Sequence, residues 1–446
     1  MLKKIKNKMH LLLLSLIILS PIFGHDQIPG QTQKRPILLK GGVIHTVSGK
    51  VLKGYDLLFS KGKIISIEKS ILSSPETDVY EIYDKHIVPG YISPVTRLGL
   101  VEIGLVKQTH DYSEVGEINP NIRANLSYNP DSELIPISRS NGVLIANSVP
   151  SSGRISGQSS TMMLDGWTWE DATLKSSTGL HINWPKMNIQ NNIKKTKTQQ
   201  RQSQDSTLRA LDFLIQNVKA YSQSRKLSQR TSTNIQKTNL KLESMSPFII
   251  DKKMIFVHAH GLIEIESAID WANKHNLKIT IVGGHDAGYI TGILIKNNIP
   301  IIIQHPEWWA TRRHEPIHYL YKLPFMLNMK GVQFCLATKT GYPYDGNIRN
   351  LQEEALRALK YGLTKEEALR SITLSAAEIL GIDEKVGSID IGKDATFFIS
   401  DLEPMNMKSK ILRAYVQGKL VDLNDRQKML KGKYEEKYKR MGRLIP

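Results

Sequence analysis

The middle of the chain alternates between short apolar runs and amphipathic segments, and this is the feature that most restricts its possible folds. Strands are predicted at residues 254–257, 278–282 and 299–303, and helices at 263–275 and 288–297. Strand, helix and strand at this spacing indicate parallel βαβ units. Each of the three strands ends in or near a histidine, at His258, His285 and His305. The sequence therefore predicts an α/β fold with imidazoles gathered at one edge of a parallel sheet.

Both ends of the chain carry short β-rich runs separated by glycine turns. Residues 37–70 contain several such runs, and Lys61-Gly62 between two of them indicates a hairpin. The same kind of segment returns at residues 386–421. We therefore expect one small sheet domain assembled from residues 35–88 and 386–425, enclosing an α/β domain at residues 89–385.

The formal net charge of +18 is concentrated in two places. Residues 186–253 hold 14 Lys and Arg against 4 Asp and Glu, and the C-terminal tail at residues 426–446 is again lysine-rich. The basic residues of the insert are interleaved with Gln, Ser, Thr and Asn rather than aromatics, and no nucleic-acid-binding pattern accompanies them. We interpret the insert at 186–253 as a solvated basic segment around one packed helix, and expect no nucleic-acid partner.

The N-terminus has the pattern of a secretory signal peptide. Lysines 3, 4, 6 and 8 precede an apolar run at residues 11–19, and a small residue, Gly24, stands before His25. The apolar run is too short to be interpreted first as a membrane span, although an uncleaved anchor helix is the alternative. The sole cysteine, Cys335, excludes an internal disulfide. We expect a signal peptide at residues 1–24, an exported bacterial periplasmic protein, and no transmembrane segment after signal removal.

Motifs in three parts of the chain resemble those of the amidohydrolase superfamily, particularly secreted relatives of imidazolonepropionase. The resemblance extends over nearly all of residues 35–425. Its motifs are Asn141-Gly142-Val143, Arg312-Arg313-His314-Glu315-Pro316, Glu367-Ala368-Leu369, Ala376-Ala377-Glu378-Ile379-Leu380-Gly381 and Gly387-Ser388-Ile389. The resemblance implies a (β/α)8 TIM barrel with a small β-sandwich domain built from both termini. It also implies metal-dependent hydrolysis of a carbon–nitrogen bond, other than a peptide bond, in a small cyclic amide-like substrate.

The metal-binding motifs of the family are incomplete in this chain. Where the family reads H-x-H on its first barrel strand, residues 92–99 read ISPVTRLG, with Val95 and Arg97 in the histidine positions. Lys339 stands in place of the eighth-strand aspartate that acts as general base. Valine offers no ligand atom, and arginine and charged lysine have no lone pair to give. By position, His258 and His285 match the family's fifth-strand and sixth-strand ligands.

Two interpretations of these substitutions remain open for the site. Arg97 and Lys339 would place positive charge where the metal was, which favours a carboxylate or phosphate ligand, unless both simply point to solvent or pair with acids after loss of function. Alternatively, His258 and His285, with His260 or His305, would hold one divalent metal, zinc being the most suitable.

We therefore expect a degenerate amidohydrolase that binds a small, anionic ligand or partners an intact paralogue. It would hold no metal or one divalent ion. The alternative is an active hydrolase with a rearranged mononuclear histidine site, so the sequence leaves open whether the protein is an enzyme. It singles out no catalytic residue.

Overall fold

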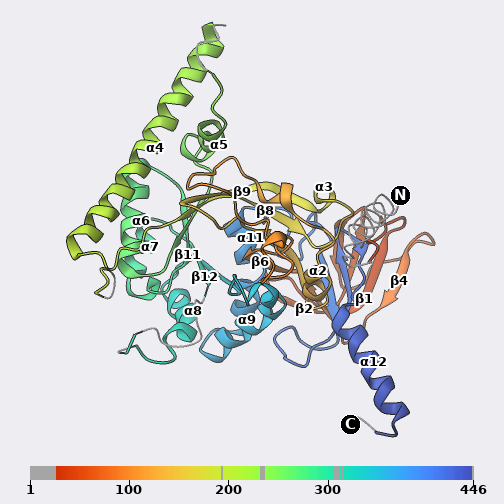
Figure 1. The fold of residues 1–446 in the computed structure, drawn as a ribbon. Helices are drawn as coiled ribbons and strands as arrows, with labels where there is room; N and C mark the ends of the chain where they lie inside the picture. The colour runs from red at the N-terminus through yellow and green to blue at the C-terminus, as the bar shows by residue number, and fades with distance from the viewer. Residues whose placement is uncertain (1–26, 192–193, 232–236, 305–311, 314, 444–446) are drawn as a thin grey trace, which may run out of the picture.

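The computed structural model describes residues 27–191, 194–231, 237–304, 312–313 and 315–443. Two eight-stranded sheets organise them, one built from both ends of the chain and one forming a central barrel (Figure 1). The predicted signal peptide and His305 lie outside the described residues. Within the described part of the chain, no helix is both long and apolar enough to span a membrane.

The first sheet joins the two ends of the chain, as the sequence predicts. Its order is β16-β15-β14-β5-β1-β2-β3, with β4 paired to β1. The β2–β3 hairpin turns at Lys61 and Gly62, whose φ angles of 49° and 77° give the left-handed pair that such turns need. All eight strands form one hydrogen-bonded sheet rather than two separate ones: β1 (Ile37–His45), β2 (Val51–Ser60), β3 (Lys63–Glu68), β4 (Asp78–Glu81), β5 (His86–Pro89), β14 (Phe397–Ser400), β15 (Ile411–Val416) and β16 (Lys419–Leu420).

The second sheet is the predicted barrel. Its strands run in chain order, and the first and last of them lie against each other, so the sheet is nearly closed. One departure from strict alternation occurs at β8, which is antiparallel to both neighbours because the connections on either side, residues 149–154 and 164–172, are too short for the crossover that parallel strands need. The strands are β6 (Tyr91–Thr96), β7 (Val143–Ser148), β8 (Ile155–Met163), β9 (Thr173–Asn183), β10 (Ile255–Ala259), β11 (Ile279–Gly283), β12 (Ile301–Gln304) and β13 (Phe334–Ala337).

Helices cover the barrel on its outside. Residues 365–380 form two helices rather than one, because Thr373 adopts a non-helical backbone with φ −131° and ψ −97°. The α-helices are α2 (Leu134–Arg139), α3 (Trp169–Ala172), α4 (Lys197–Thr231), α5 (Leu240–Ile249), α6 (Leu262–His275), α7 (Thr291–Lys296), α8 (Tyr319–Met329), α9 (Leu351–Lys360), α10 (Lys365–Ser371), α11 (Leu374–Leu380) and α12 (Arg426–Arg440). Short 3-10 turns add η1 (Lys107–Thr109), η2 (Ala124–Ser127), η3 (Ala287–Tyr289) and η4 (Asp345–Asn350).

The barrel interior is apolar along most of its length. Alternate residues of the strands face inward and form one buried cluster, while their neighbours pack outward against the helices. Cys335 belongs to the inner cluster, and burial raises the pKa of its thiol, so it is an inert core residue. Strand residues of the inner cluster are Ile92, Val95, Ile145, Phe256, Val282, Ile302, Cys335 and Ala337.

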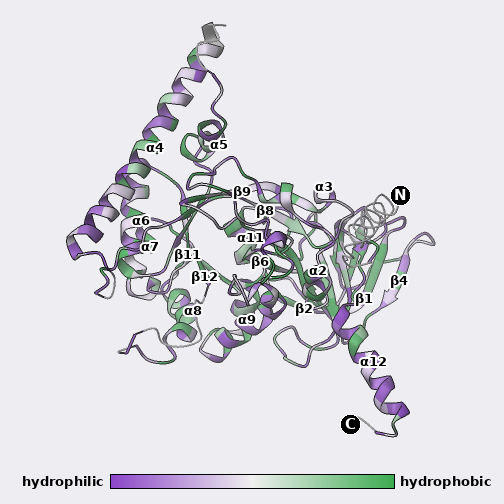
Figure 2. Ribbon diagram, in the orientation of Figure 1, coloured by the Kyte–Doolittle hydropathy of each residue, from purple (hydrophilic) through white to green (hydrophobic). Residues whose placement is uncertain are grey.

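The basic insert forms the connection from β9 to β10. Its first helix, α4, is 35 residues long and extends away from the barrel beyond α6 (Figure 1). The buried face of α4 carries Leu211, Ile215 and Val218. The Asp212 carboxylate fixes it to α6 through Lys274 Nζ and His275 Nε2, both at 2.6 Å. Figure 2 shows hydrophilic colour along most of α4 and α12.

Candidate functional site at the mouth of the barrel

The strand periodicity places the predicted site residues on the inner row at the C-terminal end of the barrel. Arg97 follows inward-facing Val95 by two residues, and His258 follows Phe256 in the same way. Lys339 stands two residues after Ala337 of β13. Because side chains alternate along a strand, these polar groups continue the inward rows where the apolar core ends. Active sites of such barrels lie at this end.

Val95, which stands where the family has a metal-binding histidine, packs in the hydrophobic core. Its side chain is 3% exposed and belongs to the inner cluster with Phe256 and Val282. The first-strand position is therefore part of the hydrophobic core, and it offers nothing to a cation.

Arg97 is a cation without an acid. Its Cζ lies 3.9 Å from the centroid of the Tyr112 ring, and its Nε is buried with no hydrogen-bond partner. Its Nη1 lies 3.8 Å from the position that a Cβ on Gly341 would take, so the guanidinium approaches the segment after β13. Within the described residues the only direct contact that satisfies its charge is this aromatic face.

Lys339 shows the same pattern on the neighbouring strand end. Its Nζ lies 4.1 Å from the centroid of the Tyr344 ring, and no described carboxylate pairs with it. Two cations, Arg97 and Lys339, thus lie partly buried at the adjoining ends of β6 and β13, each against a tyrosine ring. That the two cations bind one ligand together stays a prediction.

His258 pairs with a residue that the sequence did not single out. The Nδ1 of His181, on β9, lies 2.9 Å from the Nε2 of His258. His181 is fully buried, stacks on Phe256 at 4.8 Å between ring centroids, and leaves its own Nε2 without a partner. Burial, together with the positive fields of His260 and Arg97, lowers the pKa of His258 to about 3. The pair is therefore neutral at physiological pH.

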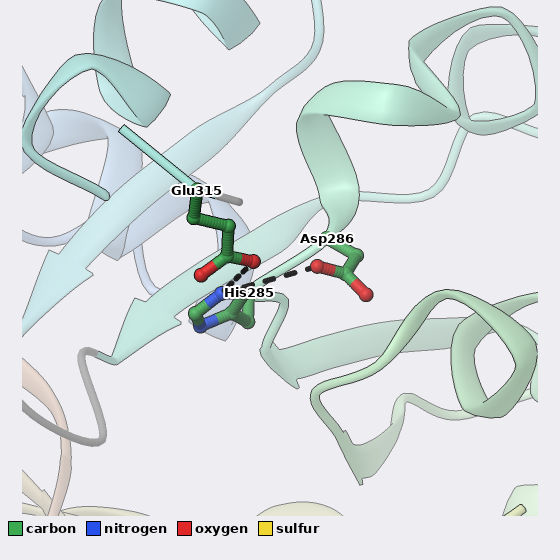
Figure 3. Close-up of side chains that lie close together, drawn as sticks. All are labelled: His285, Asp286 and Glu315. Atoms are coloured by element: carbon green, nitrogen blue, oxygen red, sulfur yellow. Dashed lines mark hydrogen bonds and ion pairs between the residues drawn. The ribbon is translucent and has the colours of Figure 1, made fainter. Parts of the chain in front are cut away.

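His285 lies in a separate, fully paired network (Figure 3). Its Nε2 is 3.2 Å from Glu315 Oε1 and 3.9 Å from Asp286 Oδ1. Arg312 donates from Nη1 and Nη2 to the two oxygens of Asp286, at 2.9 and 2.6 Å, and from Nη1 to Glu315 Oε1 at 3.1 Å. The backbone N–H of Leu262 also donates to Asp286. Both carboxylates are buried and satisfied from within the chain.

These residues do not fit the metal centre that the family resemblance implies. The described residues contain one group of three potential ligands, His285, Asp286 and Glu315, whose ligand atoms lie within 4.8 Å of one another. Arg312 occupies the same carboxylate oxygens, so a divalent ion there would lie beside a fixed positive charge. His258 points toward His181 and belongs to the other network.

Of the other two histidines considered from the sequence, His260 does not belong to the group of potential ligands found among the described residues. His260 is exposed beyond the end of β10, where its backbone N–H donates to Glu264 Oε2 at 3.1 Å. His305 lies outside the described residues. The residues that sequence reasoning missed are His181, Arg312 and Glu315. The last two stood in a quoted family motif, but their charge pairing with Asp286 depends on a fold contact that no local spacing shows.

Sequence comparisons match short parts of the chain. A family model described as the Amidohydrolase family matches residues 312–433. Imidazolonepropionase of Shewanella frigidimarina (strain NCIMB 400) is 52% identical over 42 residues, which are 9% of this chain and 10% of that protein. The amidohydrolase tasK of Hapsidospora irregularis is 31% identical over 80 residues, 17% of this chain and 8% of that protein. The chain thus matches about a tenth of the length of these curated relatives.

Structural comparisons extend over most of the chain. An amidohydrolase from Thermotoga maritima MSB8 has a TM-score of 0.76 at 24% identity, covering 86% of this chain and 99% of that one. Molinate hydrolase has a TM-score of 0.52 at 13% identity, covering 89% and 96%. These likenesses show a shared barrel fold. Together with the sequence matches they support the amidohydrolase superfamily, as the motifs at residues 367–389 implied.

Proposed function

We propose that this amidohydrolase-fold protein is a degenerate family member whose barrel mouth binds an anionic small molecule. Arg97 and Lys339 would contact the anion where relatives with complete motifs hold metal. The observation that carries the proposal is the state of Arg97: a partly buried guanidinium with a sealed Nε and no described acid. An unpaired buried donor costs about 1–3 kcal/mol, more when it is charged. A carboxylate or phosphate would compensate the charge through two parallel hydrogen bonds to the two Nη groups of the guanidinium.

The electrostatics of the neighbouring residues support an anion rather than a cation. The His181–His258 pair is neutral, and the acids of the mouth, Asp286 and Glu315, are already paired with Arg312. The balance of uncompensated charge among these residues is therefore positive. We propose that the protein acts by binding this ligand, or as the partner of an intact paralogue, without catalysing a reaction itself.

Calorimetric titration with succinate and with inorganic phosphate tests the proposal, with succinamide as the uncharged comparison. We expect succinate or phosphate to bind and succinamide not to. Arg97→Gln should weaken anion binding ten- to a hundredfold, since charge-assisted hydrogen bonds contribute about 1.5–3 kcal/mol. Lys360→Gln, at an exposed position on α9, is the matched control. Equal affinity of the wild type, Arg97→Gln and Lys360→Gln would refute the site.

An active hydrolase with one metal is the second candidate, favoured by the group of His285, Asp286 and Glu315. Elemental analysis of protein purified without chelators or immobilised nickel separates the two. We expect well under one equivalent of zinc per chain, unchanged by His285→Ala, because Arg312 occupies the carboxylates. If the wild type holds one equivalent of zinc and His285→Ala loses it, the binding-protein proposal is refuted and the active hydrolase is favoured.

We also propose export to the periplasm, supported by the basic start and the apolar run of residues 11–19. An N-terminus near His25 in the intact mass of the exported protein is the expected result.

A further inference from the structure

The C-terminal helix α12 projects from the body of the molecule, on the opposite side from α4 (Figure 1). None of its residues is buried, so tertiary packing does not cover its sides. Its start is nonetheless fixed. The buried carboxylate of Asp425 accepts hydrogen bonds from the backbone N–H of Lys428, at 2.9 Å, and from the Oγ of Ser140, just after α2, at 2.8 Å. The structure therefore presents a capped helix whose sides are open to a partner.

Four apolar or aromatic side chains form one stripe along this helix. They stand at positions i, i+4, i+8 and i+11, which lie on the same side of an α-helix: Leu430, Tyr434, Tyr438 and Met441. The exposed fractions of Leu430, Tyr434 and Met441 are 42, 48 and 52%. None of the four belongs to a buried cluster of the described residues. Water therefore covers an apolar stripe of the kind that protein helices usually bury.

The apolar stripe is bordered by positive charge. Residues 426–440 carry seven Lys and Arg against two Asp and Glu. Lys431 and Lys437 flank the stripe on its two sides. The Nζ of Lys437 lies 5.9 Å from the centroid of the Tyr434 ring and 6.0 Å from that of the Tyr438 ring. An anionic surface that contacts the stripe would therefore meet ammonium groups on both sides of it.

The acids of the helix do not cancel this charge. Its two glutamates pair with Lys431 and Arg440, at 3.6 and 2.8 Å, in exposed positions where ion pairs are weak. Within the described residues, no carboxylate pairs with Lys433, Lys437 or Lys439. The charge of the helix thus matches an anionic partner. A second copy of this chain, whose formal net charge is also +18, would be repelled.

We propose that α12 docks on the surface of an anionic lipid bilayer, with its apolar stripe in the headgroup region and its lysines beside the lipid phosphates. A basic helix with an apolar face lies in such an interface without crossing the membrane. Tyrosine, with an apolar ring and a polar hydroxyl, suits this depth. A nucleic-acid backbone would attract the same lysines but leave Leu430 and Met441 in water, so a bilayer accounts for more of the helix.

Co-sedimentation with vesicles of phosphatidylcholine, alone or mixed with phosphatidylglycerol, tests the role of charge. The full-length protein should bind the mixed vesicles at least about tenfold more tightly than the neutral ones, and added salt should weaken the binding. The double variant Lys433→Glu/Lys437→Glu should lower the affinity for mixed vesicles at least about tenfold. Because α12 buries no residue, the body of the protein should stay folded.

The matched control is Lys197→Glu/Arg201→Glu. It changes the net charge equally, at the same spacing, in exposed positions of the other basic helix, α4. It should leave the affinity for mixed vesicles within about twofold of the wild type, because these positions lie outside the proposed contact. Equal losses in the two double variants would show a diffuse effect of net charge and overturn the proposal.

The apolar stripe is tested by Leu430→Ser, with Met429→Ser as its control. Both side chains are exposed, but Met429 lies on another face of the helix. Leu430→Ser should weaken binding to mixed vesicles about threefold or more, since it removes apolar area from the interface, and Met429→Ser should not. Equal effects of the two changes would refute the orientation of the helix. Arg97→Gln should leave vesicle binding unchanged, which separates this surface from the barrel mouth.

A fluorescent label locates the contact independently of residues 1–24. The sole cysteine, Cys335, is buried, so Tyr434→Cys can carry a polarity-sensitive fluorophore at that position alone. Its emission should shift to shorter wavelength with mixed vesicles and stay unchanged with neutral ones. The same label at Val79→Cys, an exposed position on β4, should not respond. An unshifted label on α12, or tighter binding of a single-stranded DNA oligonucleotide than of the mixed vesicles, would overturn the membrane assignment.

Discussion

The two halves of the barrel mouth, one around His285 and one around His258, differ in how their charged side chains are paired. Around His285, two buried carboxylates and one guanidinium satisfy one another through short hydrogen bonds. Around His258, the partners of Arg97 and Lys339 among the described residues are aromatic faces, and the His181–His258 pair is neutral. The first half is complete without a ligand. The second half carries positive charge that no described acid compensates. For this reason we place the proposed binding site there.

The largest expected effect comes from breaking the paired half with Arg312→Met. Removal of the guanidinium leaves the Asp286 and Glu315 carboxylates buried and uncompensated, and such losses cost about 3–5 kcal/mol. Urea denaturation should show a free energy of unfolding lower by about that amount. The same variant should bind zinc more tightly than the wild type, because the carboxylate oxygens become free. Arg313→Met, at an exposed neighbour, is the control, and a stability equal to that control would disprove the pairing.

Acid should weaken the protein through its buried neutral histidines. The folded-state pKa values of His45, His86, His181 and His258 are all lowered, with burial the main cause. As the pH falls below about 6.5, these histidines become protonated in the unfolded chain but not in the folded chain. Their contribution to the free energy of unfolding is therefore complete above that pH and declines below it. The decline continues to about pH 4 for His45 and about pH 3 for His258.

Each such histidine contributes a slope of about 1.4 kcal/mol per pH unit within its window. Denaturation in urea at pH 7, 6 and 5 measures the sum. His258→Gln should reduce the slope. Equal stability at pH 7 and pH 5 would contradict the neutral histidines.

Arg97→Met, in the half around His258, should have the smallest effect on the free energy of unfolding. Arg97→Met removes a buried donor without an acceptor, so the free energy of unfolding should rise by about 1 kcal/mol, opposite to Arg312→Met. It also removes one of the positive charges that lower the pKa of His258. Thermal denaturation of the two variants side by side makes the comparison. A marked loss of stability in Arg97→Met would show that its guanidinium has a partner.

Much of the fold could be predicted because it depends on local periodicity. The strands that lead to His258 and His285, the hairpin at Lys61-Gly62 and the sheet shared by both ends follow from alternation and glycine position. The antiparallel β8 could not be predicted in this way. Its composition is compatible with either direction, and the shortness of the connections on both sides decides the direction.

The site could be predicted only in part for a related reason. Motif position identified Arg97, Lys339 and His258, but a hydrogen-bond partner is set by register between distant strands. His181 is opposite Phe256 on the parallel pair β9 and β10, and this register brings its ring to His258. Arg312 reaches Asp286 from a loop after β12, and no spacing in the sequence indicates that contact.

The sheet shared by the two ends also constrains how the chain can be made. Phe397 of β14 pairs with Pro89 of β5, so the edge of β5 stays without its neighbour until the ribosome has synthesised nearly the whole protein. An exposed strand edge is a template for pairing with other chains, and long-range pairing is slow. The barrel can close before the sheet domain is complete, since its strands lie between the two ends. The N-terminal strands are therefore the part of this fold whose pairing is completed last.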